Sequence, residues 1–97
     1  MPKATKALYD HDRLVNASQR TVSEGCVRIF DRIQGWPKEN QILSLAAAFL
    51  LACMSARIPA QDAFTATKNL MADPLTSSGM GAQFQAMKFH LDTEVNA

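Results

Sequence analysis

The stretch Asp10-His11-Asp12 is the one place in the sequence where residue types suited to acid–base chemistry stand together. A carboxylate beside an imidazole can orient the ring and raise its basicity. Adjacent residues of a helix point about 100° apart, however, so neighbouring carboxylates do not reach the ring by default. We therefore interpret these residues as part of a helix surface.

Other residues that could bind a metal or a phosphate lack the spacing that such sites require. His90, Cys26 and Cys53 form no C-x-x-C or H-x-x-x-H pattern, and the two cysteines are interpreted as small buried hydrophobic residues. The segment TSSGMG, residues 76–81, lacks the order of a phosphate-binding loop and is interpreted as a flexible connector. The sequence thus predicts no catalytic residue, metal or cofactor, and we expect no enzyme.

A row of basic side chains leaves nucleic-acid binding open as the alternative function. The row consists of Lys6, Arg13, Arg20, Arg28 and Arg32, of which the first three lie seven residues apart. Such a stripe could follow a phosphate backbone. Glu24 lies four residues from both Arg20 and Arg28, which is typical of helix ion pairs, and the net charge of +1 supplies no general attraction to nucleic acid. Two helices meeting at residues 57–59 could form a helix-turn-helix, but the second offers only Lys68 as a cation.

The hydrophobic periodicity predicts helices throughout and no strand. In residues 5–34, Leu8, Val15, Val22 and Ile29 recur every seven positions, which favours one continuous first helix, although residues 16–18 could cap and divide it. A corner at residues 35–37 leads to a central helix over 37–56. A third helix over 59–72 and a last helix over 81–95 follow.

The central helix is the element around which we expect the chain to fold. Its apolar side chains spread over roughly 240° of the helical wheel, so it must be covered on several sides. Residues 42–56 are interrupted by Ser44 and Ser55 and are shorter than the roughly 20 residues of a membrane span. We expect a core helix, no membrane partner, and a cytoplasmic protein, because the N-terminus has no apolar run of signal-peptide type.

The composition is that of an ordinary globular protein, with 47% hydrophobic and 20% charged residues. The predicted fold is all-α: a compact four-helix orthogonal bundle around a buried central helix at about 37–56, in a single domain over residues 1–97. The segment Lys38 to Met71 resembles small helical accessory proteins of phage and prophage genomes. That resemblance carries no catalytic or ligand motif, and it implies an accessory or host-interacting protein.

Two apolar surfaces are predicted to bind protein partners. On the last helix, Phe89 points away from the core-facing side chains and is flanked by Ala82 and Ala86, so the ring could anchor a partner helix. The alternative is that Phe89 folds back over Met71 or Leu75 to close the core. The stripe of the first helix, including Leu8, Val15 and Val22, predicts the seam of a homodimer. We therefore predict a non-enzymatic protein-interaction or regulatory accessory protein that acts through a helix face.

Overall fold

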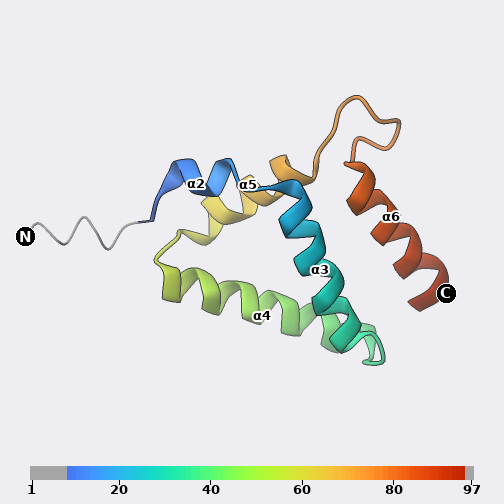
Figure 1. Ribbon diagram of the computed structural model, residues 1–97. Coiled ribbons are helices and arrows are strands. Elements are labelled where there is room, and N and C mark those ends of the chain that lie inside the picture. The colour runs from blue at the N-terminus through green and yellow to red at the C-terminus, as the bar shows by residue number, and fades with distance from the viewer. Residues whose placement is uncertain (1–8, 96–97) are drawn as a thin grey trace, which may run out of the picture.

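The computed structural model describes residues 9–95 of the 97-residue chain, and within this range it contains α-helices and no strand (Figure 1). The all-α class is therefore confirmed. An isolated β-bridge pairs Ala72 with Met80. The α-helices are α2 (His11–Val15), α3 (Gln19–Ile33), α4 (Lys38–Ala56), α5 (Ala60–Met71) and α6 (Ala82–His90). A π-helical turn over Leu91–Val95 follows α6.

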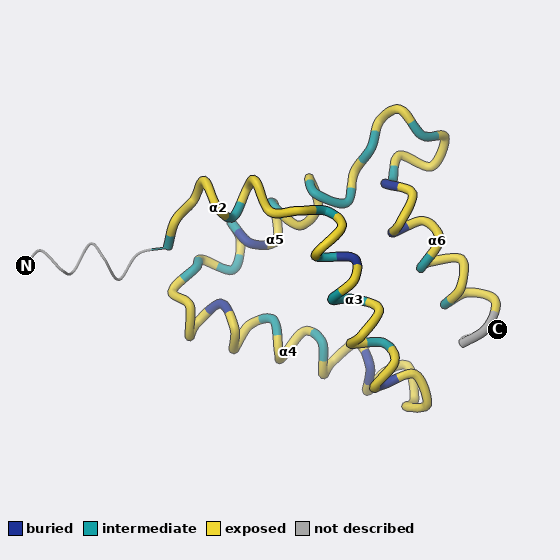
Figure 2. The backbone as a smooth tube through the Cα atoms, viewed as in Figure 1, coloured by how far each residue is buried: buried dark blue, intermediate teal, exposed yellow. Residues whose placement is uncertain are grey.

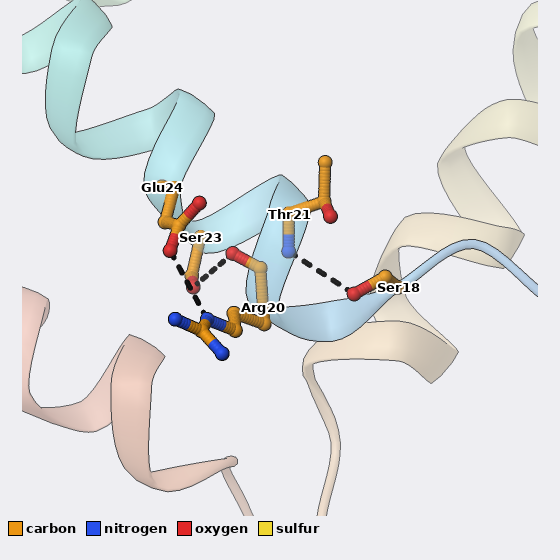
Figure 3. A network of polar contacts seen from close by, with 5 residues as sticks. All are labelled: Ser18, Arg20, Thr21, Ser23 and Glu24. Carbon is orange, nitrogen blue, oxygen red and sulfur yellow. Dashed lines mark hydrogen bonds and ion pairs between the residues drawn. The ribbon is translucent and has the colours of Figure 1, made fainter.

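The prediction of one continuous first helix is wrong, because the chain turns at residues 16–18 and begins α3 afresh. Asp10 accepts a hydrogen bond from the Arg13 N–H at 3.2 Å and caps α2, and Ser18 caps α3 by accepting from the Thr21 N–H at 3.2 Å (Figure 3). Side-chain caps of this kind stabilise a helix start by about 1 kcal/mol. The capping residues therefore divide the segment despite its apolar stripe.

The corner between α3 and α4 lies where the sequence predicted it, and a buried glutamine closes it. Gln41 is only 4% exposed. Its side-chain amide nitrogen lies 2.9 Å from the carbonyl oxygen of Ile33, 3.3 Å from that of Gln34 and 3.0 Å from that of Trp36. The last carbonyls of a helix have no partner within the helix. From the first turn of α4, the Gln41 amide therefore supplies a hydrogen-bond donor to carbonyls at the end of α3.

The prediction that the central helix is buried is wrong. Along α4 one face, at steps of four residues, is buried or half-buried and consists of Gln41, Leu45, Phe49 and Cys53. Most of the rest is exposed (Figure 2), including large side chains that keep 50–73% of their surface: Ile42, Leu43, Leu50, Leu51 and Met54. Of the other helices, α5 packs most extensively on α4, and the side of α4 opposite its buried face is left uncovered.

Within the described residues α4 is also the one helix whose length and apolar composition would suffice to cross a membrane. Its mean hydropathy is 1.3, and 11% of the apolar window is buried. Length and composition alone are weak evidence for a span, because core helices of soluble proteins share them.

The core is small and divided among pairs of helices rather than gathered around α4. Its buried hydrophobic residues come one each from four helices: Ile33, Cys53, Ala63 and Phe84. The packed pairs are α4 with α5, α2 with α5, and α3 with α6. Long-range hydrogen bonds add two connections to α5: Tyr9 Oη, just before α2, donates to Asp62 at 2.6 Å, and Gln19 Nε2 of α3 donates to the Leu70 carbonyl at 2.7 Å.

Candidate partner-binding surfaces

The last helix has the two faces that the sequence predicted. Phe84 is 3% exposed, and Met87 and Leu91 are half-buried against the rest of the chain. Phe89 is 66% exposed, and the neighbouring Ala82 and Ala86 are exposed as well. Leu75 is 94% exposed, so Phe89 does not close a core over it. The structure thus brings Phe89, Ala82 and Ala86 together on one accessible side of α6.

These three residues line a shallow depression of about 520 Å³, which we call the Phe89 hollow. Its other wall is the connector before α6, and the lining on that side includes Thr76, Ser77, Ser78 and Met80. The connector was predicted to be flexible. In the structure the Thr76 hydroxyl oxygen lies 2.9 Å from the carbonyl oxygens of both Asp73 and Met80, to either of which its one O–H can donate, and the Asp73 N–H donates to the Gly79 carbonyl at 2.9 Å. Hydrogen bonds within the connector therefore define this wall of the hollow.

A second concave surface, between α3 and α6, was missed in the sequence. This α3–α6 groove has a volume of about 500 Å³ and an apolar floor that includes Val27, Phe30, Met87 and Leu91. Charged and polar residues stand at its rim, namely Glu24, Asp31, Gln34, Gln83 and His90. The sequence contains one indication of this groove. Val27 and Phe30 lie three residues apart on one side of α3, outside the seven-residue stripe, and so mark a second apolar side of that helix.

The predicted dimer seam on the first helix is not a continuous surface. Val15 lies on α2 and is 50% exposed, whereas Val22 is half-buried and Ile29 is 47% exposed on α3. Leu8 lies outside the described residues. The turn at residues 16–18 changes the helical register between Val15 and Val22, so their seven-residue spacing does not align them.

The same turn interrupts the predicted basic stripe. Arg13 lies on α2, whereas Arg20, Arg28 and Arg32 lie on α3; Lys6 is outside the described residues. Arg20 Nε is 3.2 Å from Glu24 Oε2 (Figure 3), and the two side chains are 81% and 58% exposed. An exposed pair of this kind contributes at most a few tenths of a kcal/mol. The ion-pair interpretation of Arg20 is confirmed.

The residues considered for catalysis have structural contacts instead. Asp10 caps α2, and the exposed His11 ring has its Nδ1 atom 3.2 Å from the Tyr9 hydroxyl. Both cysteines are free, and burial raises the pKa of the Cys26 thiol, which disfavours its reactive thiolate form. Among the side chains that the structure describes, no three potential metal ligands lie together.

The outward side of α4 carries a stripe of apolar residues, which we call the outer α4 face: Leu43, Ala47, Leu50 and Met54. At about 100° per residue these four side chains point within some 60° of one another. They lie roughly 150° from the buried face that contains Phe49. The sequence predicted an apolar side here, but not that it would face away from the rest of the chain.

Comparison of this chain with protein-family models, with curated proteins and with solved structures finds no match.

Proposed function

We propose that the protein is a non-enzymatic interaction protein of regulatory or accessory type, which binds another protein through the Phe89 side of α6. The observation that carries this proposal is the 66% exposure of Phe89 at the edge of a hollow. Single exposed apolar residues are common on protein surfaces. A ring that borders a concave surface differs, because a partner can cover both ring and hollow together.

The residues around Phe89 suit a helix or loop that approaches closely. Ala82 and Ala86 lie one helical turn apart and project little beyond the backbone, so a partner backbone can come near while the ring enters a pocket. Ser77, Ser78 and Gln85 stand around this apolar centre and can exchange hydrogen bonds with the partner. An apolar centre with a polar rim is the usual arrangement of a protein–protein interface.

The proposal for the partner rests only on the resemblance seen in the sequence of residues 38–71 to accessory proteins of phage and prophage, because the comparisons supply no match. We infer a protein of the host cell, bound in the cytoplasm. The partner's chemistry follows from the hollow: it should present an apolar pocket that accepts an aromatic ring, bordered by groups that hydrogen-bond to hydroxyls.

The proposal is tested with Phe89→Ser and a matched control, Phe64→Ser. Phe64 is a second half-exposed phenylalanine, 51% exposed on α5 and away from the hollow. Tagged wild-type and variant proteins are used to capture proteins from the native cell, and the captured proteins are quantified by mass spectrometry. We expect the amount of the specific partner captured by Phe89→Ser to fall at least about tenfold, as for the loss of an interface anchor. Phe64→Ser should capture as much of the partner as the wild type does.

Both variants should melt within a few degrees of the wild type, because neither ring is buried. Equal capture by all three proteins would overturn the proposal. Capture that depends on nucleic acid and weakens steeply between low and moderate salt would favour the alternative, a nucleic-acid-binding factor that uses Arg28 and Arg32 on α3.

A further inference from the structure

The helix α4 has two opposite apolar faces, and the chain itself covers only one. Leu43, Leu50 and Met54 on the outer α4 face are 68%, 50% and 73% exposed, and Leu51 beside them is 65% exposed. A helix that is apolar all round belongs in the interior of an assembly. The outer α4 face therefore needs a second body to cover it.

We propose that this second body is another copy of the chain, with the two α4 helices packed antiparallel about a two-fold axis. The outer face residues Leu43, Ala47, Leu50 and Met54 follow one another at intervals of four, three and four. This is the spacing of the a and d positions at which helices pack side chains between one another. A two-fold axis applies the same stripe to both chains, so the contact closes on itself as a dimer.

The area available is sufficient for a specific interface. Burial of an aliphatic side chain of this size corresponds to on the order of 100 Å². Leu43, Leu50, Leu51 and Met54, with the exposed Ala46 and Ala47 beside them, would thus bury on the order of 1,000 Å² over both copies, which is the threshold for a biological interface and the size of a weak, reversible dimer.

The antiparallel direction follows from size and from charge. An antiparallel pair of α4 helices places Ala47 opposite Leu50 of the second copy and Leu43 opposite its Met54. At the centre of the contact a small residue therefore faces a large one. The antiparallel pair also brings the exposed Glu39, in the first turn of α4, near the second copy's Arg57, directly after its last turn. A parallel pair would set Ala47 against Ala47 and like charges against each other at both ends, which is unfavourable.

A lipid bilayer is the other surface that could cover α4, and the structure favours it less. The stretch without charged residues runs from Asn40 to Ala56 and would be about 25 Å long, short of the roughly 30 Å of a bilayer core. Gln41 ties the start of α4 to the end of α3, where Asp31 and Arg32 are exposed. Inserting α4 would draw these charges toward the lipid.

The dimer is tested by light scattering of the purified full chain over a concentration series, with Leu50→Glu as the disrupting variant. Ala48→Glu is the matched control, because Ala48 is exposed on the same helix but points roughly 130° away from the stripe. We expect the wild type and Ala48→Glu to reach twice 10.6 kDa, and Leu50→Glu to weaken the dimer at least about tenfold. A wild type that stays at 10.6 kDa up to high micromolar concentration, or a Leu50→Glu protein that dimerises like the control, would overturn the proposal.

Oxidative cross-linking tests the direction and does not depend on a disrupting variant. A mixture of Leu43→Cys and Met54→Cys chains should form a disulfide between positions 43 and 54, located by peptide mapping, whereas each variant alone should form little. Efficient cross-linking of each variant with itself would instead show a parallel pair and overturn the antiparallel geometry.

Flotation with vesicles of phosphatidylcholine and phosphatidylglycerol tests the bilayer. Wild type that floats with the vesicles and Leu50→Glu that does not would assign the outer face to lipid and overturn the dimer. The dimer and the proposed function involve different helices, so they can fail separately: Phe89→Ser should leave the dimer mass unchanged, and loss of the dimer alone says nothing against partner capture at Phe89.

Discussion

Phe84 and Phe89 lie five residues apart on α6 and occupy opposite environments: Phe84 is 3% exposed, and Phe89 is 66% exposed. Five residues correspond to a rotation of roughly 140° around a helix, so the two rings point to nearly opposite sides. One ring therefore attaches α6 to the chain, and the other is available to a partner.

The first prediction concerns these two rings. Phe84→Ala should lower the free energy of unfolding by about 3–5 kcal/mol, because it removes the most buried large side chain of a small core. Phe89→Ala serves as the control and should change it by no more than about 0.5 kcal/mol. Chemical denaturation at one fixed protein concentration measures both, since dimerisation would make stability depend on concentration. Similar losses for the two variants would contradict the assignment of the faces.

The sequence predicted most helix boundaries because local signals mark them. The central helix was expected over 37–56 and is Lys38–Ala56, and the third was expected over 59–72 and is Ala60–Met71. Pro37 and Pro59 precede these helices, and the residue before Pro74 cannot easily remain helical. The first helix was misjudged because the apolar stripe was weighted above Ser18, whose hydroxyl caps a new start.

The burial of α4 could not be predicted from the sequence, because periodicity identifies an apolar face but not the surface that covers it. Phe49, on the inner face of α4, is only half-buried, so we expect Phe49→Ala to lower the free energy of unfolding by less than Phe84→Ala does. The exposed position of Phe89 was one of two alternatives that the sequence left open. The α3–α6 groove depends on residues more than 50 positions apart, such as Val27 and Met87, which no local pattern connects.

The second prediction concerns the titration of Tyr9, the single tyrosine of the chain. The hydrogen bond that its hydroxyl donates to Asp62 raises the pKa of Tyr9 above the usual value of about 10, and desolvation and the carboxylate charge act in the same direction. A pKa that is raised in the folded state means that this contact stabilises the fold below pH 10 and is lost as the pH rises through the folded pKa.

The tyrosinate absorbance of the wild type should therefore appear above pH 10, and Asp62→Asn should move the transition back toward 10. Asp31→Asn, an exposed carboxylate on α3, is the control and should titrate like the wild type. If the tyrosinate absorbance of Asp62→Asn appears at the same pH as that of the wild type, the hydrogen bond from Tyr9 to Asp62 does not set the pKa of Tyr9.

The third prediction compares two glycines. Gly25 lies inside α3 with nothing within 4 Å of an added methyl group, so Gly25→Ala should stabilise the protein by about 0.5–1 kcal/mol through the better helix propensity of alanine. At Gly81 an added Cβ would lie 2.5 Å from Gln19 Nε2, which donates to the Leu70 carbonyl. Gly81→Ala should displace that side chain and cost about 1 kcal/mol. Thermal or chemical denaturation should show changes of opposite sign; stabilisation by both variants would mean that the Gln19 bond contributes nothing.

The last prediction concerns Gln41, which joins α4 to the end of α3. Gln41→Met keeps the length of the side chain but removes the donor, so the Trp36 carbonyl loses the amide and the Ile33 carbonyl keeps only the bond from the Trp36 N–H at 3.0 Å. The net loss of an intramolecular hydrogen bond costs about 1 kcal/mol, and we expect a loss of that size. Gln41→Glu should be worse at neutral pH, because a carboxylate cannot donate and would face three carbonyl oxygens.

Gln61→Met is the matched control for this glutamine. Gln61 is exposed on α5 and, within the described part of the chain, bonds only Thr65 one turn away at 3.2 Å, so its replacement should change stability by no more than about 0.5 kcal/mol. Denaturation should thus show Gln61→Met as the most stable of the three variants, Gln41→Met as less stable and Gln41→Glu as the least stable. The corner between α3 and α4 would be held by something other than this side chain if Gln41→Met proved as stable as the control.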